Sequence, residues 1–231
     1  MEKSIDLVFK NLDDWRHLPS YQLERRADIF FSLYLKEVLE AKFAKRLNGI
    51  HLFDVLVPEF PFRKGAYDAK NEKDNQSTKV DYLAVSEDHK HIFLIELKTD
   101  NASVGSNKYL NDAKSAGFAK LLEGVVAIRN ASRAHDKYDC LMEQLEKLEL
   151  VKKKQKQDKP SRSNDYQVTL KVRKPRIAVV MLTPTKLKKN QYRFNSITFL
   201  DFRKTVKKYE DPLSKRFFKS LKDWEKQAGT K

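Results

Sequence analysis

The chain has 231 residues, enough for one α/β domain with a full hydrophobic core. Hydrophobic residues make up 40% of it and aromatic residues 11%, which excludes a wholly disordered protein. The single cysteine, Cys140, excludes an internal disulfide framework and a cysteine-based zinc site, and is typical of a reducing cytosol. We expect a cytoplasmic protein without a signal peptide or membrane anchor, because residues 1–15 are charged throughout and no 18-residue window is apolar.

The net charge of +15 is distributed unevenly along the chain. Residues 151–231 hold 24 Lys or Arg against 7 Asp or Glu, whereas residues 1–150 hold 23 against 25. Contacts between Lys or Arg and phosphate groups supply most of the sequence-independent affinity for nucleic acid. The basic last third therefore predicts a nucleic-acid-binding protein, with DNA the expected ligand, and a solvated basic tail is the alternative.

Residues 21–47 are predicted to form the first long helix. Pro19 and Ser20 supply a helix-start signal. Seven apolar residues then recur at helical spacing: Leu23, Ala27, Phe30, Phe31, Tyr34, Val38 and Ala41. The pattern indicates a helix with one core-facing stripe.

Residues 52–62 are predicted to form the first strand, and Pro58 and Pro61 confine its end to a sheet edge or a bulge. Residues 63–79 have no apolar period, so we expect a mobile loop or insertion there. Such a loop could contact a substrate, although long loops are more often plain surface.

Residues 80–85 and 91–100 are predicted to form neighbouring strands. The apolar run Ile92 to Ile95 is too short for a helix and rich in residues that favour strands, which indicates a strand buried on both faces. Residues 87–90 are polar and are expected to form the hairpin loop between the two strands.

The hairpin register would bring two acidic residues together. If Ser86 pairs with His91, Asp81 lies directly opposite Glu96. Glu96 and Lys98 share a face, because side chains alternate along a strand. Two carboxylates about 5 Å apart repel each other unless a cation lies between them, so Lys98 or a divalent metal ion is expected there.

Asp81, Glu96, Leu97 and Lys98 have the form D-x(n)-E-x-K. This segment resembles the core of the PD-(D/E)xK nuclease superfamily, the restriction-endonuclease-like phosphodiesterases. Lys79-Val80 stands where the family name puts a proline. The context is also similar, because a Gly/Ser-containing turn at residues 104–106 and an amphipathic helix follow the two strands.

The resemblance covers roughly Tyr21 to Phe202. It implies that residues 1–231 form a single nuclease-like domain of the α/β class, with a restriction-endonuclease-like mixed β-sheet flanked by α-helices. Flexible insertions are expected at residues 63–79 and 153–168.

The resemblance also implies a metal-dependent nuclease. Asp81 and Glu96 would bind Mg²⁺ together with the carbonyl oxygen of Leu97, and Mn²⁺ could substitute. The metal would activate water and neutralise charge at the scissile phosphate. Lys98 is expected to orient the attacking water or to stabilise the transition-state charge, in preference to acting as a general base.

In many members of this superfamily the helix before the first strand carries a further acidic residue that reaches the metal. Glu24 is the preferred candidate, because it precedes the apolar core of the predicted helix in a similar way. Asp28 lies one turn further on nearly the same face, and Glu37 and Glu40 are weaker rivals.

The rest of the chain alternates predicted helices and strands. Helices are expected at residues 107–129, 138–153, 202–209 and 213–224, and strands at residues 177–182 and 196–202. Between them, residues 155–165 are predicted to form a charged linker, either a disordered loop or an arm that grips a nucleic-acid backbone.

Two other functions fit the same sequence. One is a non-catalytic nucleic-acid-binding subunit that retains the nuclease fold. The other is an interaction subunit of a larger defence, restriction or transposition complex, and a nuclease could also assemble in this way. The complete set of Asp81, Glu96 and Lys98 favours an enzyme, and the spacing of the five histidines disfavours a zinc hydrolase.

Overall fold

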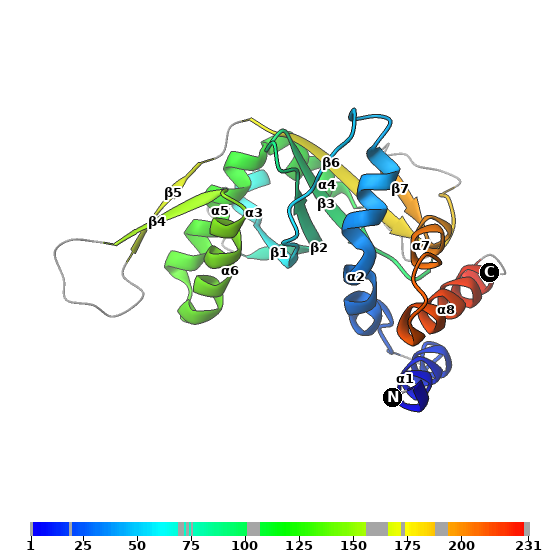
Figure 1. The fold of residues 1–231 in the computed structure, drawn as a ribbon. Coiled ribbons are helices and arrows are strands. Elements are labelled where there is room, and N and C mark those ends of the chain that lie inside the picture. The colour runs from blue at the N-terminus through cyan, green and yellow to red at the C-terminus, as the bar shows by residue number, and fades with distance from the viewer. Residues whose placement is uncertain are drawn as a thin grey trace. The chain divides into compact units, whose positions relative to one another are not determined.

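The structure is a computed structural model that describes residues 2–18, 20–68, 72, 74, 76–100, 107–155, 166–171, 174–187 and 194–228. It shows a mixed α/β protein whose main sheet has five strands in the order β1-β2-β3-β6-β7 (Figure 1). These strands are β1 (Val57–Arg63), β2 (Ser77–Val85), β3 (His91–Leu97), β6 (Arg176–Thr183) and β7 (Asn195–Thr198). Helices flank the sheet, since α5 (Phe118–Ala131) packs on β1 and α7 (Phe199–Val206) contacts β7.

The chain forms two compact units. The first unit comprises Met1–Ile50, Glu96–Ser106 and Val180–Lys231. The second unit comprises His51–Ile95 and Asn107–Val179. Because the boundaries fall inside β3 and β6, each of these strands contributes residues to both units.

The main sheet is mixed because it contains both antiparallel and parallel strand pairs. Strand β2 pairs antiparallel with both β1 and β3, as expected for strands joined by short connections. Strands β6 and β7 pair parallel. The predicted mixed sheet is therefore confirmed.

Strand β3 confirms the prediction of a strand buried on both faces. All its residues from Ile92 to Leu97 are buried. The strand ends at Leu97, three residues before the predicted end. Beyond it, the backbone N–H of Lys98 donates to the carbonyl oxygen of Leu182 in β6, at 2.8 Å, which holds the chain against the sheet.

In the first unit, four helices pack around an aromatic core. They are α1 (Glu2–Trp15), α2 (Glu24–Phe43), α7 and α8 (Pro212–Ala228). The Phe31 ring of α2 lies 5.2 Å from that of Phe217 in α8, and Phe9 of α1 lies 6.0 Å from Phe217, between ring centroids. Helix α1 was not predicted, because charged residues interrupt the spacing of the few apolar residues that reach this core.

Helix α2 is shorter than the predicted helix at residues 21–47. Ser20 has a left-handed φ of 65°, and the residue before the helix, Leu23, makes no side-chain cap hydrogen bond. Ser20 therefore lies in a turn and does not start the helix, and Pro19 of the predicted start signal lies outside the described residues. At the other end, Gly49 adopts φ 79° and its N–H donates to the carbonyl of Ala44, which closes the chain after the helix.

In the second unit, the predicted helix at residues 107–129 is two helices, α4 (Lys108–Ala116) and α5. Gly117 separates them with φ 86°, a left-handed conformation that a helix does not contain. Helix α6 (His135–Lys147) ends six residues before the predicted residue 153, and Glu149 follows it with φ 54°.

Two segments that were predicted to be loops contain regular structure. Residues 63–79 include helix α3 (Lys64–Tyr67) and the start of β2. Hydrogen bonds from the N–H groups of Lys64 and Gly65 to the carbonyls of Gln76 and Asp74 close this segment. Strand β4 (Val151–Gln155) occupies the predicted end of the helix at residues 138–153. Strand β5 (Tyr166–Leu170) begins within the predicted flexible insertion at residues 153–168, of which residues 156–165 lie outside the described residues.

The predicted strand at residues 196–202 ends at Thr198, where α7 begins. The Thr198 side chain accepts a hydrogen bond from the N–H of Asp201, whose carboxylate accepts one from the N–H of Thr198. This capping box turns the chain into a helix four residues earlier than the strand pattern indicates. The predicted strand at residues 177–182 and the last helix are confirmed as β6 and α8.

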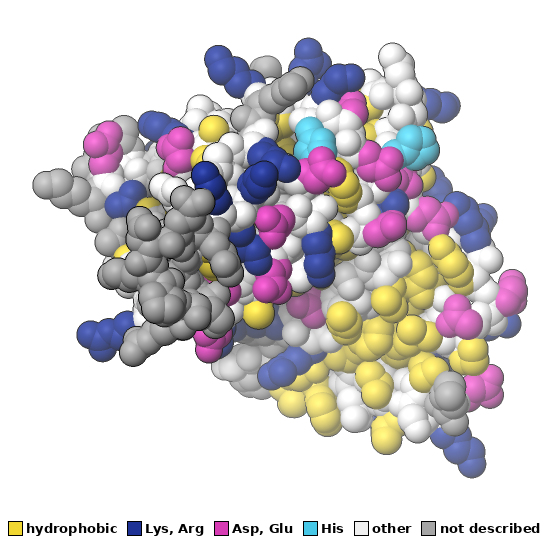
Figure 2. Space-filling model, turned by 60° about the vertical axis from the view of Figure 1, so that its left-hand side comes forward, with side chains coloured by type: hydrophobic (Ala, Val, Ile, Leu, Met, Phe, Trp, Pro, Cys, Tyr) yellow, Lys and Arg dark blue, Asp and Glu magenta, His cyan; other side chains and the backbone are white. Residues whose placement is uncertain are grey.

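Large hydrophobic side chains are exposed on the first unit. Those on α1, α2 and the turn after α1 are between 46% and 60% exposed: Leu7, Val8, Trp15, Leu18, Ile29 and Leu33. Figure 2 shows hydrophobic side chains gathered over a broad area of the face it draws. None of the helices in the described part of the chain is long and apolar enough to cross a membrane.

Candidate active site at the end of strand β3

The end of β3 carries a mostly buried ion pair. The ammonium nitrogen Nζ of Lys98 donates to Oε1 of Glu96 at 2.8 Å, and the two side chains are 19% and 10% exposed. Both side chains therefore lie on one face, as alternation along the strand predicts. Removing two charges from water is expensive, so a pair in this position is weak support for stability and marks a candidate functional site.

Asp81 lies in β2, and its neighbours follow the predicted register. Tyr82, the next residue, pairs with Ile95, the residue before Glu96. At the other end of the hairpin, the N–H of Ser86 donates to the carbonyl of His91 at 3.0 Å. The predicted register is thus confirmed from Tyr82 to Ser86.

Arg16 connects α1 to the residue that follows Lys98. Its Nη2 donates to the carbonyl oxygen of Thr99 at 3.5 Å, and its guanidinium lies 5.8 Å from the ring centroid of Trp224. Burial lowers the pKa of Arg16 below its ordinary value, while the carboxylates of Asp13, Asp100 and Glu24 oppose that shift. The positive charge of the Arg16 guanidinium therefore interacts with all three carboxylates.

Glu24, the preferred acidic candidate, acts electrostatically on Arg16. It is the first residue of α2 and is half-buried. The same guanidinium contacts Thr99, which directly follows Lys98.

Two of the three rival acidic residues have other recorded partners. Oδ1 of Asp28 accepts from the N–H of Ile29 at 2.7 Å, within its own helix. Glu37 bonds Lys208 and Tyr209; burial raises the pKa of Glu37, but the hydrogen bonds from these two residues outweigh it and leave the pKa lowered. Glu40 is half-buried further along α2. Glu24 remains the preferred candidate.

The donor set of the predicted site suits one particular kind of metal ion. Among the residues that the structure describes, no group of three or more His, Cys, Asp or Glu side chains is placed to hold a metal. Mg²⁺, however, is commonly bound through one or two carboxylates and keeps several waters. Asp81 and Glu96 supply two carboxylates, so their chemistry fits Mg²⁺ with the Leu97 carbonyl as a further oxygen ligand.

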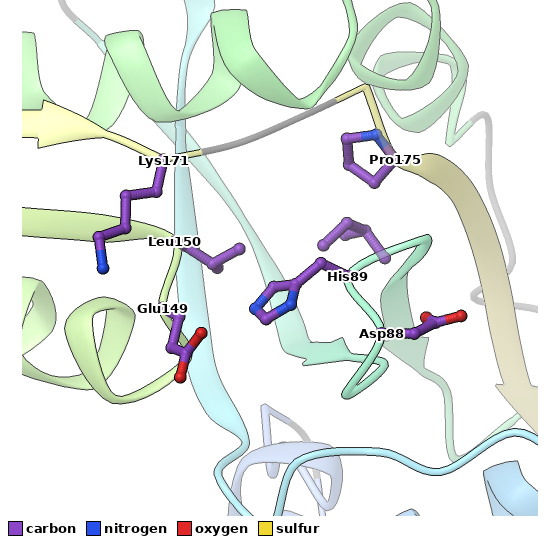
Figure 3. A pocket seen from close by; sticks show the side chains of 7 residues that line it. Asp88, His89, Glu149, Leu150, Lys171 and Pro175 are labelled. Atoms are coloured by element: carbon purple, nitrogen blue, oxygen red, sulfur yellow. The ribbon is translucent and has the colours of Figure 1, made fainter.

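A hollow of about 220 Å³ in the second unit is lined by other residues. Its lining includes Asp88 and His89 of the hairpin loop and Glu149 and Lys171 beside strands β4 and β5 (Figure 3). Strand β3 begins beside this hollow, whereas Glu96 lies near the other end of the strand.

The polar groups of the hollow serve the local structure. A hydrogen bond from Ser86 lowers the pKa of Asp88 to about 2, and the N–H of Lys90 supports it. His89 Nε2 lies 3.0 Å from the carbonyl oxygen of Leu148. In Figure 3 the Asp88 carboxylate points away from the His89 ring. These contacts hold the hairpin loop, and we therefore place the candidate site at the end of β3.

Arg16 is the residue that sequence reasoning missed. The signal for its helix was present, because Ile5, Phe9 and Leu12 follow helical spacing and Phe9 and Leu12 are buried. No sequence motif singles out the arginine itself, since its contact with Thr99 joins residues 83 positions apart.

Comparisons of this chain with protein-family models, with curated proteins and with solved structures found no match. Any assignment of function therefore depends on the residues of the site.

Proposed function

We propose that this protein is a metal-dependent nuclease of the PD-(D/E)xK type with a restriction-endonuclease-like fold. The observation that carries the proposal is the buried Glu96–Lys98 ion pair at the end of the central strand β3. The described register supports it, because its continuation by one residue from Tyr82 and Ile95 would set Asp81 opposite Glu96.

The proposed metal ligands are Asp81, Glu96 and the carbonyl oxygen of Leu97. Hard oxygen ligands suit Mg²⁺, and Mn²⁺ accepts the same set. When bound, the ion supplies positive charge that activates water and offsets the charge of the scissile phosphodiester.

Lys98 would act on the phosphate side of the site. Its ammonium is held by Oε1 of Glu96, and its backbone is fixed to β6 through Leu182. A cation fixed in this way stabilises charge that develops on phosphate oxygens, because little reorganisation is needed during the reaction. Glu24 would assist from α2, where its carboxylate acts electrostatically on Arg16.

The substrate is proposed to be DNA. The positive excess of residues 151–231 supports a polyanionic ligand, because lysine and arginine contacts with phosphates provide affinity without sequence preference. The carboxylates of the site require a metal before a negatively charged backbone can approach them.

Cleavage of supercoiled and linear DNA by the purified protein tests the proposal, with Mg²⁺ or Mn²⁺ compared with EDTA. Lys98→Ala and Asp81→Asn should each reduce metal-dependent cleavage at least ~100-fold, as expected on loss of a group that stabilises or activates the reacting atoms. Lys222→Ala, which removes an exposed lysine of α8, is the matched control and should cut like the wild type.

Two results would overturn the proposal. One is metal-dependent cutting that persists in folded Lys98→Ala and Asp81→Asn proteins. The other is wild-type protein that binds DNA in a salt-sensitive way but cuts no substrate with either metal, which would leave the non-catalytic nucleic-acid-binding subunit as the function.

A further inference from the structure

Strands β4 and β5 form a two-stranded antiparallel hairpin in the second unit (Figure 1). Its register pairs Lys152 with Thr169 and Lys154 with Gln167. Because side chains alternate, these four residues lie on one face of the hairpin, and Val151, Lys153, Tyr166, Val168 and Leu170 lie on the other.

One face is anchored to helices α5 and α6. Val151 is completely buried, and the ring of Tyr166 lies 4.0 Å from the guanidinium carbon of Arg129. The Tyr166 hydroxyl donates to Oδ1 of Asp139 at 2.5 Å, and Nε of Arg129 donates to the same oxygen at 3.0 Å. A two-stranded hairpin is marginally stable alone, so these contacts hold it in place.

Anchoring also neutralises the one lysine on this face. Nζ of Lys153 lies 3.6 Å from a Glu146 oxygen and 3.7 Å from a Glu143 oxygen, and 5.4 Å from the centre of the Tyr166 ring. Its backbone N–H donates to Glu146 Oε1 at 3.0 Å. Lys153 is therefore part of the scaffold.

The opposite face is exposed and carries only neutral and positively charged groups. Lys152, Lys154, Gln167 and Thr169 are all exposed, and every one of these side chains can donate a hydrogen bond. Neither Lys152 nor Lys154 has an ion pair recorded among the described residues, and no acidic residue occurs in the two described strands. Exposed Lys171, Lys174 and Arg176 continue the positive charge after β5.

We infer that this hairpin binds the phosphate backbone of double-stranded DNA through the face formed by Lys152, Lys154, Gln167 and Thr169. The inference rests on the proposed function, because it assigns a binding surface to the same substrate. Ammonium groups and neutral donors on an anchored ribbon match phosphate oxygens, which are acceptors only.

The dimensions of the hairpin favour duplex DNA over duplex RNA as the ligand. Paired strands lie about 4.8 Å apart, and a two-stranded ribbon enters the major groove of B-form DNA, which is about 12 Å wide. The major groove of A-form RNA is deep and narrow, so a ribbon does not enter it. Lys152 and Lys154, two residues apart, would contact phosphates at the groove edge while Gln167 and Thr169 lie beside them.

The test measures how binding depends on salt, in EDTA so that no strand is cut. We expect wild-type protein to bind a short duplex of random sequence, with a slope of log K against log salt that reflects its phosphate contacts. Lys152→Gln/Lys154→Gln should make the slope less negative by about 1.8, because each lost contact with B-DNA contributes about 0.9. The control, Lys3→Gln/Lys45→Gln on exposed positions outside residues 151–231, removes the same charge and should leave the slope near the wild-type value.

Single-stranded DNA and duplex RNA complete the test. Their binding should change less than that of duplex DNA in the hairpin variant. An unchanged slope for duplex DNA, or an equal loss with all three nucleic acids or with the Lys3→Gln/Lys45→Gln control, overturns the inference.

Failure of this inference is distinguishable from failure of the proposed nuclease. If the wild type cuts DNA with Mg²⁺ but the hairpin variant keeps the wild-type slope, the hairpin assignment alone is wrong. If the slope of the hairpin variant becomes less negative by the expected amount but the wild type cuts no DNA, the nuclease proposal is wrong and the assignment of the binding surface is supported.

Discussion

The Nζ atom of Lys98 lies 2.8 Å from Oε1 of Glu96, and both side chains are mostly removed from solvent. Glu96 lies in β3 and Lys98 lies just beyond the end of that strand, and their side chains are on one face.

The pair should show strong energetic coupling. Lys98→Met should lower the free energy of unfolding by about 3 kcal/mol, because it leaves a buried carboxylate without its cation. Glu96→Gln/Lys98→Met should recover part of that loss, since neither charge remains. Urea unfolding of the two single variants and the double variant forms a double-mutant cycle. Losses that simply add would show that the two groups do not interact.

Arg16 should stabilise the first unit by joining α1 to the segment after β3. Arg16→Gln should lower the free energy of unfolding by about 1–2 kcal/mol, because it removes a hydrogen bond to the Thr99 carbonyl and the contact with Trp224. The control is Lys10→Gln on the same helix, which loses an exposed pair with Asp14 worth at most about 0.5 kcal/mol. Equal effects of the two substitutions in urea unfolding would refute this role.

The two faces of α2 should respond differently to truncation. Phe31 is fully buried among Phe199, Phe202 and Phe217, whereas Leu33 is 56% exposed. Phe31→Ala should therefore cost about 3–5 kcal/mol, and Leu33→Ala should change stability by less than about 0.5 kcal/mol. Thermal or urea unfolding measures both, and a large loss for Leu33→Ala would show that its side chain is covered in solution.

The Tyr166 hydroxyl should make the stability of the protein fall at alkaline pH. Burial and the hydrogen bond to Asp139 raise the pKa of Tyr166 to about 12, from its usual value near 10. The folded protein therefore holds this proton more tightly than the unfolded chain. The resulting stability is fully present below about pH 10 and is lost as the pH rises towards about 12.

Tyr166→Phe removes the titrating group and should flatten this part of the stability curve. At neutral pH it should cost about 1 kcal/mol, the usual contribution of one hydrogen bond. Urea unfolding of both proteins at several pH values checks the effect. Parallel curves for wild type and variant above pH 10 would mean that Tyr166 does not cause the alkaline loss.

Local sequence patterns determined the central hairpin. The apolar runs before Ser86 and after His91, with four polar residues between them, predicted both strands and their register, and the pairs from Tyr82 to Val85 confirm it. Register could be predicted because a shift by one residue would turn every apolar side chain of a buried strand to the wrong face. The same alternation predicted that Glu96 and Lys98 share a face.

Tertiary contacts decided the rest. The lysine-rich strand β4 forms because Val151 is buried and because the partner strand brings Tyr166 to Arg129 and Asp139 of two helices. Helix α1 forms where Phe9 meets the ring of Phe217, more than 200 residues away. Local spacing does not show which partner such a side chain will contact, since each side chain gains its stabilisation from a residue distant in sequence. Alternation of side chains therefore determined the motif, and long-range packing determined the scaffold around it.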